Sequence, residues 1–157
     1  MKWYKPIIII IIINIVVSCT KYEEGPLLSL RSKKSRLEGE WQYDMYIENN
    51  IDKSIEIIDN KIIFEKKGDV YSYEYNRSTG VTNLYTGKWN FDNKRENLTI
   101  IISALVSDIY TTQIMVTKTY DCKIIMLKNN AIKLSGSIIK SNQYKISIYN
   151  IIIKLKK

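Results

Sequence analysis

The sequence predicts an all-β protein in which one antiparallel meander of about eight strands closes into a barrel. Two observations support this fold class: apolar and polar residues alternate with period two through most of residues 37–157, and short turn sequences interrupt the alternation at regular intervals. No long stripe with helical spacing is present. Closure is expected because an open sheet leaves unpaired edges. The interior of such a barrel is either filled by side chains or encloses one small ligand, and the sequence leaves both open.

The first strand is predicted from Trp41 to Glu48, with its odd-numbered residues facing inward. A hairpin follows, in which Ile62 and Phe64 share one face before the turn and residues 70–75 return after it. Further strands are predicted at 85–91, 98–103, 109–118, 120–127 and 131–135, and in a final run that begins at Tyr144.

The final run contains two apolar sets of opposite parity. Tyr144, Ile146 and Ile148 form the first set, and the isoleucines at 151 and 153 belong to the second. A regular strand cannot bury both sets on one face. We therefore predict a β-bulge near Tyr149–Asn150.

Residues 1–18 are predicted to be a signal peptide. Lys2 and Lys5 give a positive start, residues 7–17 are apolar except for one asparagine, and a small residue precedes Cys19. As a helix, this apolar run covers roughly 16 Å of a hydrocarbon core about 30 Å thick, so a retained membrane span is not expected. The alternative is an ordinary secretory signal that is cut elsewhere and leaves Cys19 as a free thiol.

Residues 19–36 are predicted to be a polar tether with a short helical turn in its second half, ahead of a single domain at 37–157. The net charge is +8. For an exported protein, this charge favours anionic lipid headgroups or acidic glycans as neighbours, and nucleic acid is not expected.

The amino-acid composition excludes several classes of catalytic and structural chemistry. The chain has no histidine and two cysteines, Cys19 and Cys122. Serine–histidine and cysteine–histidine catalysis are therefore excluded, and no metal site or cofactor motif is found. If Cys19 is modified, Cys122 has no partner for an internal disulfide, and it is expected to be a small buried side chain.

Two motifs carry a family resemblance. Val16-Val17-Ser18-Cys19 resembles the lipobox of bacterial lipoproteins, and Gly39-Glu40-Trp41 resembles the G-x-W signature of lipocalins. The order of later residues is similar to that of the lipocalin-like lipoproteins of Bacteroides-type bacteria, and the resemblance covers residues 1 to about 135. The residues that carry the later part of this pattern are Phe64, Gly68, Tyr71, Gly87, Trp89, Leu98, Ile100, Ile124, Leu127, Ile132 and Leu134.

The resemblance implies a lipid anchor and a place in the cell envelope. Cys19 would receive a diacylglycerol and palmitate-type acyl chains, and Thr20 after it is similar to the pattern of outer-membrane lipoproteins. Residues 19–24 loosely resemble a surface-export signal, which leaves the periplasmic and the external face open. Lipocalins also place a late arginine over the tryptophan of the signature, but no arginine follows Arg95 here, which leaves Lys154 as a weaker substitute.

Aromatic residues provide the candidate ligand-binding site. Tyr71, Tyr73 and Tyr75 alternate with polar residues and are predicted to face the barrel interior. There they would lie beside Trp41, Tyr43 and Trp89. These side chains either fill the core or hold a small hydrophobic, flat or sugar-like ligand.

Glycoside hydrolysis needs a pair of carboxylates and no histidine. Glu65, Glu74 and Asp108 qualify only by elimination, and the parity of Glu65 and Glu74 predicts that both face outward. We assign no catalytic residue. The sequence thus predicts a monomeric, lipid-anchored, non-catalytic envelope protein with a lipocalin-like binding domain. The alternative is an accessory envelope protein with a filled barrel whose loops contact another protein or a glycan.

Overall fold

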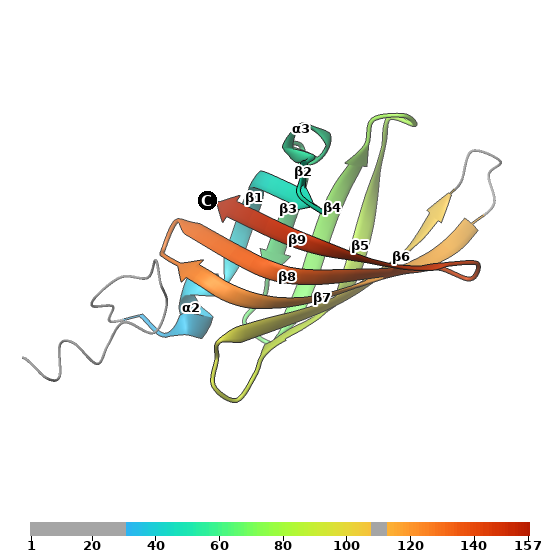
Figure 1. Ribbon diagram of the computed structural model, residues 1–157. Helices are drawn as coiled ribbons and strands as arrows, with labels where there is room; N and C mark the ends of the chain where they lie inside the picture. The colour runs from blue at the N-terminus through green and yellow to red at the C-terminus, as the bar shows by residue number, and fades with distance from the viewer. Residues whose placement is uncertain (1–30, 108–112) are drawn as a thin grey trace, which may run out of the picture.

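The computed structural model describes residues 31–107 and 113–157 (Figure 1). The predicted signal peptide, Cys19, the first part of the predicted tether and Asp108 lie outside the described residues.

Eight antiparallel strands form a closed barrel, which confirms the predicted fold class. The strands pair in the order β1-β3-β4-β5-β6-β7-β8-β9, and β9 pairs again with β1 (Figure 1). A two-residue strand, β2, pairs with the end of β1. The strands are β1 (Gly39–Glu48), β2 (Ile51–Asp52), β3 (Lys61–Phe64), β4 (Asp69–Asn76), β5 (Val81–Phe91), β6 (Asn97–Ser107), β7 (Gln113–Leu127), β8 (Ala131–Ser141) and β9 (Ile146–Lys156).

Two short helices lie at opposite ends of the barrel (Figure 1). Helix α2 (Lys33–Leu37) begins at Ser32, whose hydroxyl accepts a hydrogen bond from the Ser35 N–H at 3.1 Å. Helix α3 (Ser54–Ile57) follows β2. Within the described ranges, neither helix has the length and apolar character that crossing a membrane requires.

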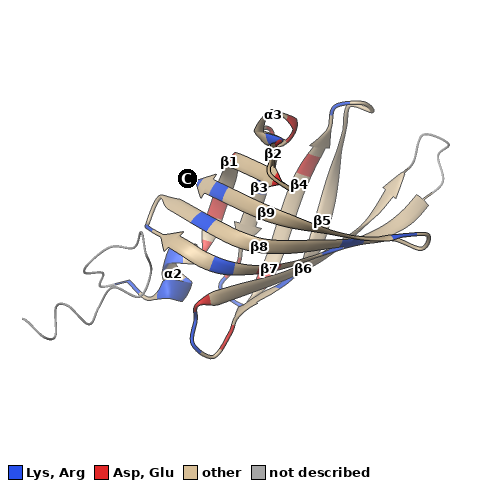
Figure 2. Ribbon diagram, viewed as in Figure 1, with Lys and Arg blue, Asp and Glu red and all other residues tan. Residues whose placement is uncertain are grey.

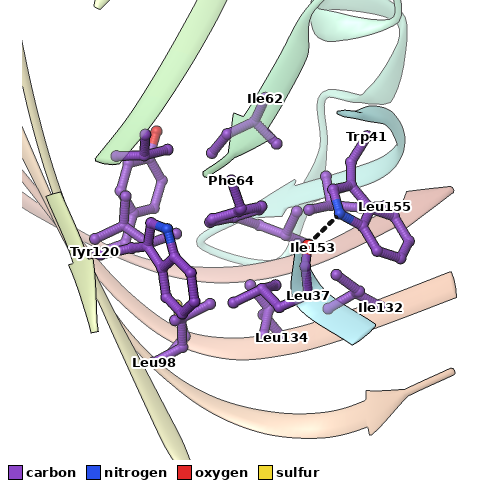
Figure 3. Close-up of a cluster of buried hydrophobic side chains, with 14 of the residues drawn as sticks. Leu37, Trp41, Ile62, Phe64, Leu98, Tyr120, Ile132, Leu134, Ile153 and Leu155 are labelled. Carbon is purple, nitrogen blue, oxygen red and sulfur yellow. Dashed lines mark hydrogen bonds between the residues drawn. The ribbon is translucent and has the colours of Figure 1, made fainter. Parts of the chain in front are cut away.

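The barrel interior is solid at the α2 end. Trp41, Phe64, Leu98 and Leu134 are at most 2% exposed, and side chains from several strands meet there (Figure 3). The Trp41 indole N–H donates to the Leu37 carbonyl at 2.6 Å, which joins α2 to the first strand. This half of the barrel is therefore a packed core.

Strand β1 contains a β-bulge that the sequence analysis did not predict. The pairing with β9 shifts register between Tyr43 and Met45, so the inward face changes parity. Trp41 and Tyr43 are buried as predicted, but beyond the bulge Tyr46 and Glu48 are buried in place of the odd-numbered residues.

The bulge predicted near Tyr149–Asn150 is wrong. Strand β9 pairs with β8 without a register shift, and its inward face is carried by Ile151, Ile153 and Leu155. Ile146 and Ile148 instead face solvent, 71% and 67% exposed. The conflict between the two apolar sets is resolved by exposing one of them.

The cation over the signature tryptophan, Trp41, is Lys157. The prediction that Lys154 takes the place of the late arginine is therefore wrong. The Lys157 ammonium lies 4.6 Å from the Trp41 ring centre and donates to the Glu38 carbonyl at 3.1 Å. Lys154 forms an ion pair with Asp44 at 2.8 Å.

Two glycines allow neighbouring strands to approach closely. A Cβ on Gly87 would lie 1.8 Å from the Ile101 carbonyl oxygen, and one on Gly136 would lie 2.1 Å from the Asp121 carbonyl oxygen. Both contacts are with backbone, so a side chain at either position requires the strands to separate.

Candidate functional site

The barrel mouth beneath α3 contains a polar pocket of about 130 Å³. The pocket lies at the opposite end of the interior from the packed core described above. Its walls come from the end of β1, the α3 segment and the inward faces of β4, β7 and β8. The lining residues are Tyr43, Tyr46, Glu48, Lys53, Glu56, Ile57, Asn60, Glu74, Lys118, Tyr120 and Lys140.

Glu48 is the centre of a charged cluster in this pocket. Its side chain is 6% exposed, and its carboxylate accepts hydrogen bonds from Lys53 and Lys140, each at 2.7 Å. The Tyr46 hydroxyl donates to the same carboxylate at 2.9 Å. Burial opposes ionisation of Glu48, but the bonds from the two lysines and the tyrosine outweigh it and lower its pKa to about 2.

A second ion pair joins two strands that are not neighbours in the sheet. Lys118 on β7 donates to the Glu74 carboxylate on β4, and the two side chains are 12% and 19% exposed. The Lys118 ammonium also lies 4.3 Å from the centre of the Tyr85 ring. Burial lowers the pKa of Lys118, and the neighbouring Glu74 carboxylate opposes that shift.

Tyrosines form the floor of the pocket. Burial is the main cause that raises the pKa values of Tyr43, Tyr46 and Tyr120 well above the usual range for tyrosine. These phenols therefore stay protonated and can both donate and accept hydrogen bonds. Close to Tyr43, the Ser72 hydroxyl is also buried at this floor.

Three of the six aromatic residues predicted to form a site lie inside the barrel. Trp41, Tyr43 and Trp89 are buried, 0%, 7% and 5% exposed. Tyr43 alone among them lines the pocket. Trp89 packs edge-on against Phe64, with ring centres 5.8 Å apart, and belongs to the packed core.

The predicted inward orientation of Tyr71, Tyr73 and Tyr75 is wrong. The buried positions of β4 are Val70 and Ser72, and Tyr75 is 38% exposed. The tyrosines occupy the outer face, where Lys61 lies 5.0 Å from the Tyr73 ring centre.

The predicted outward orientation of Glu74 is wrong for the same reason. It shares the parity of Val70 and Ser72, and it lines the pocket.

The pairing of β3 with β4 explains these corrections and contains the signal that was missed. Residues opposite each other in an antiparallel pair share a face. Phe64 lies opposite Val70, and Ile62 lies opposite Ser72. Counting across the turn from the inward-facing Phe64 therefore places Val70, Ser72 and Glu74 inside.

No comparable signal identified Glu48, Lys118 and Lys140. Glu48 faces inward only because of the bulge in β1. Lys118 and Lys140 lie opposite each other on β7 and β8. Threonines flank Lys118, and an isoleucine and a serine flank Lys140. Such a pattern is typical of solvated strands.

The arrangement is suited to holding a small polar molecule. The lining has three lysines, three glutamates and three phenol groups, so charges of both signs and neutral hydroxyls face one small space. No group of acidic, cysteine or histidine side chains with the arrangement of a metal site occurs within residues 31–107 and 113–157.

Comparison with known proteins adds no family to this description. No protein-family model matches the chain, and the curated proteins include no significant relative. The fold and the pocket define the class: a closed eight-stranded antiparallel barrel with a packed core at one end and a charged pocket at the other.

Proposed function

We propose that this protein is a lipid-anchored protein of the bacterial cell envelope that binds a small, hydroxyl-rich ligand in the mouth of its barrel. Cys19 is the anchor, as the lipobox resemblance implies, and the outer membrane is the proposed location. The protein acts by binding and not by catalysis, and it takes no cofactor. The observation that carries the ligand-binding proposal is the charged pocket beneath α3.

The energetics of buried ion pairs favour a binding role for the pocket. Removing charges from water costs about as much as their mutual attraction returns, so apolar side chains often stabilise an interior equally well. The Glu74–Lys118 pair and the Glu48 cluster therefore contribute little that a filled apolar mouth would lack. Their groups are held in place for contact with a solute, which is the arrangement that a specific polar site needs.

The size and chemistry of the pocket favour a sugar-like ligand over a lipid. Pockets for drug-sized molecules occupy about 300–1,000 Å³. A volume of about 130 Å³ suits a ligand of monosaccharide size or smaller. Phenol, ammonium and carboxylate groups match hydroxyls, and the α2 end of the interior is occupied by buried apolar side chains.

Thermal-shift and calorimetric titrations with a panel of neutral, acidic and amino monosaccharides test this proposal. We expect one sugar class to raise the melting temperature of the full chain in mild detergent. The double variant Lys118→Met/Glu74→Leu should keep the fold and lose this response. The control Lys88→Met, which breaks an exposed ion pair with Asp69 on the outer surface, should retain it. Absence of binding across the panel, or unchanged binding by the double variant, contradicts the proposal.

The anchor is tested separately by mass spectrometry of the native protein. We expect cleavage before Cys19 and a diacylglycerol-sized mass increase on that residue, both lost when lipoprotein processing is inhibited. An unmodified thiol at Cys19 contradicts the lipoprotein assignment and leaves the pocket proposal standing.

A further inference from the structure

The β8–β9 hairpin extends beyond the point where the barrel closes. Strand β1 pairs with β9 only as far as Glu48 opposite Ile151, whereas β9 begins at Ile146. The Asn49 N–H still donates to the Asn150 carbonyl at 2.9 Å. Among the described residues, no strand pairs with this side of residues 146–149. Figure 1 shows the hairpin projecting away from the α2 end.

The hydrogen-bond pattern shows which backbone groups face the open side. In an antiparallel ladder, hydrogen-bonded and non-hydrogen-bonded pairs alternate. The Asn142 N–H donates to the Lys145 carbonyl at the turn, so the next hydrogen-bonded pair is Lys140 with Ser147. Ile146 and Ile148 lie between such pairs. Their N–H and C=O groups therefore point to the open edge.

The side chains of the same two residues are also uncovered. Ile146 and Ile148 project from the outer face, and Tyr144 at the turn is 74% exposed. A surface hollow of about 250 Å³ continues from this edge and is lined in part by Ile47, Asn150 and Ile152. Exposed isoleucines beside unsatisfied backbone groups are the features that an added β-strand covers.

Charge indicates the chemistry of the occupant. Residues 131–157 contain six lysines and no acidic residue, and lysines are spread over both strands and the turn (Figure 2). Two copies of this hairpin would repel each other. Insertion into lipid would leave the Ile146 and Ile148 backbone groups without partners, which is costly in a bilayer. Lys140, Lys154 and Lys156 already form ion pairs with Glu48 and Asp44, whereas Lys145 lies at the turn beside the open edge. An extended polypeptide that carries acidic residues satisfies the backbone groups of the edge and gives Lys145 a counter-charge.

We propose that the open edge of β9 is a docking site for an extended segment of another protein, in which apolar and acidic residues alternate. The segment adds a strand beside Ile146–Ile148, and its acidic side chains face Lys145. This inference is independent of the proposed pocket ligand, because Lys145, Ile146 and Ile148, which would contact the added segment, do not line the pocket.

Synthetic peptides test the proposal directly. An eight-residue capped peptide of alternating valine and glutamate is titrated against the full chain in mild detergent, with the matching valine–lysine peptide as its counterpart. We expect saturable binding of the acidic peptide alone, with slower amide hydrogen exchange at Ile146 and Ile148. Equal binding of both peptides, or of neither, overturns the proposal.

Two variants locate the binding to this edge. Ile148→Pro removes an edge-facing N–H while the β8–β9 ladder bonds remain, so we expect about tenfold weaker binding and an unchanged fold by circular dichroism. Lys145→Glu should shift preference toward the lysine peptide. Lys128→Glu makes the same change in net charge as Lys145→Glu, but at the α2 end of the barrel. This control should leave the preference for the acidic peptide unchanged.

Ultracentrifugation and flotation distinguish the other occupants. Self-association that Ile148→Pro abolishes would identify a second copy as the occupant. Edge-dependent adsorption to phosphatidylglycerol vesicles would identify a membrane. Either result overturns the proposal.

Discussion

Glu48 is the residue on which the charge balance of the pocket depends. It compensates both Lys53 and Lys140, and its pKa of about 2 lies below the usual 4.5. A carboxyl whose pKa is lowered by folding stabilises the folded state fully above pH 4.5. That stabilisation declines as the pH falls through the folded-state pKa of about 2.

We expect Glu48→Gln to lower the free energy of unfolding by about 3 kcal/mol at pH 7, since it leaves two lysines without their counter-charge. The difference from the parent protein should shrink between pH 4.5 and pH 2. Urea unfolding of both proteins across this range measures it. Glu40→Gln, which removes an exposed ion pair with Lys61, should change stability by less than about 1 kcal/mol. A constant difference between Glu48→Gln and the parent across the pH range contradicts the assignment.

Cys122 is predicted to be chemically inert while the protein is folded. Its side chain is 1% exposed, and burial raises the pKa of its thiol to about 12. Iodoacetamide should therefore modify Cys122 only at the rate of unfolding, and in urea the reaction should be rapid. Peptide mapping separates this thiol from Cys19. Rapid native labelling at Cys122 would show that β7 opens locally.

At the scale of elements, the bulge in β1 creates the pocket. If all residues of β1 paired with β9 in regular alternation, the pattern that begins at Trp41 would place Met45 and Ile47 inside, and Glu48 would face solvent. The Asp44 side chain itself lies outside the barrel interior and is held by Lys154 and Lys156 at 2.8 and 3.0 Å. The register with β9 beyond the bulge, and not the identity of Asp44, determines which residues face inward.

Deleting Asp44 should leave the inward face of β1 unchanged, because it is the one residue of this stretch without a partner on β9. We expect Asp44→Ala to reduce stability by about 1 kcal/mol or less, because only exposed ion pairs are lost. The deletion loses the same ion pairs and removes the bulge, and it should keep Tyr46 and Glu48 opposite Ile153 and Ile151, with sugar binding retained. Chemical denaturation and ligand titration of the two variants provide the comparison. Loss of sugar binding by the deletion variant alone would mean that the bulge itself, and not the register beyond it, positions Glu48.

The sequence predicts the positions of the strands better than it predicts which face of each strand is buried. Most strand positions and the burial of Trp41, Tyr43 and Trp89 follow from local alternation. Alternation alone predicts the wrong face for the β4 tyrosines, because aromatic residues suit either side of a half-buried strand. The pairing of Phe64 with Val70 decides which side is buried. The Glu48 cluster combines a bulge with contacts between residues far apart in the chain, which local patterns do not encode.

At the scale of the whole molecule, neighbouring strands of the barrel lie so close together at Gly87 and Gly136 that a side chain at either position would overlap backbone atoms. Gly136 on β8 lies opposite Cys122 on β7, where a Cβ would overlap the Asp121 carbonyl. We expect Gly136→Ala to lower the free energy of unfolding by about 2–3 kcal/mol, in the range typical of overpacking. Thermal and chemical denaturation test this prediction. Ser135→Ala, at the neighbouring position, should have a much smaller effect.

The division of the interior into a packed end and a polar mouth determines which ligands the molecule can accept. A barrel that carries lipids needs apolar space along its axis, but here Phe64 is 1% exposed and lies among the buried residues of the core (Figure 3). Its ring also contacts the Trp89 ring edge-on. We therefore expect the full chain to show no saturable uptake of a fluorescent long-chain fatty acid beyond that of detergent alone. Phe64→Ala should lose about 3–5 kcal/mol of stability and open a cavity that an apolar probe can enter. Tight fatty-acid binding by the parent protein would mean that the core rearranges around an apolar ligand, and the polar pocket would then not be the principal site.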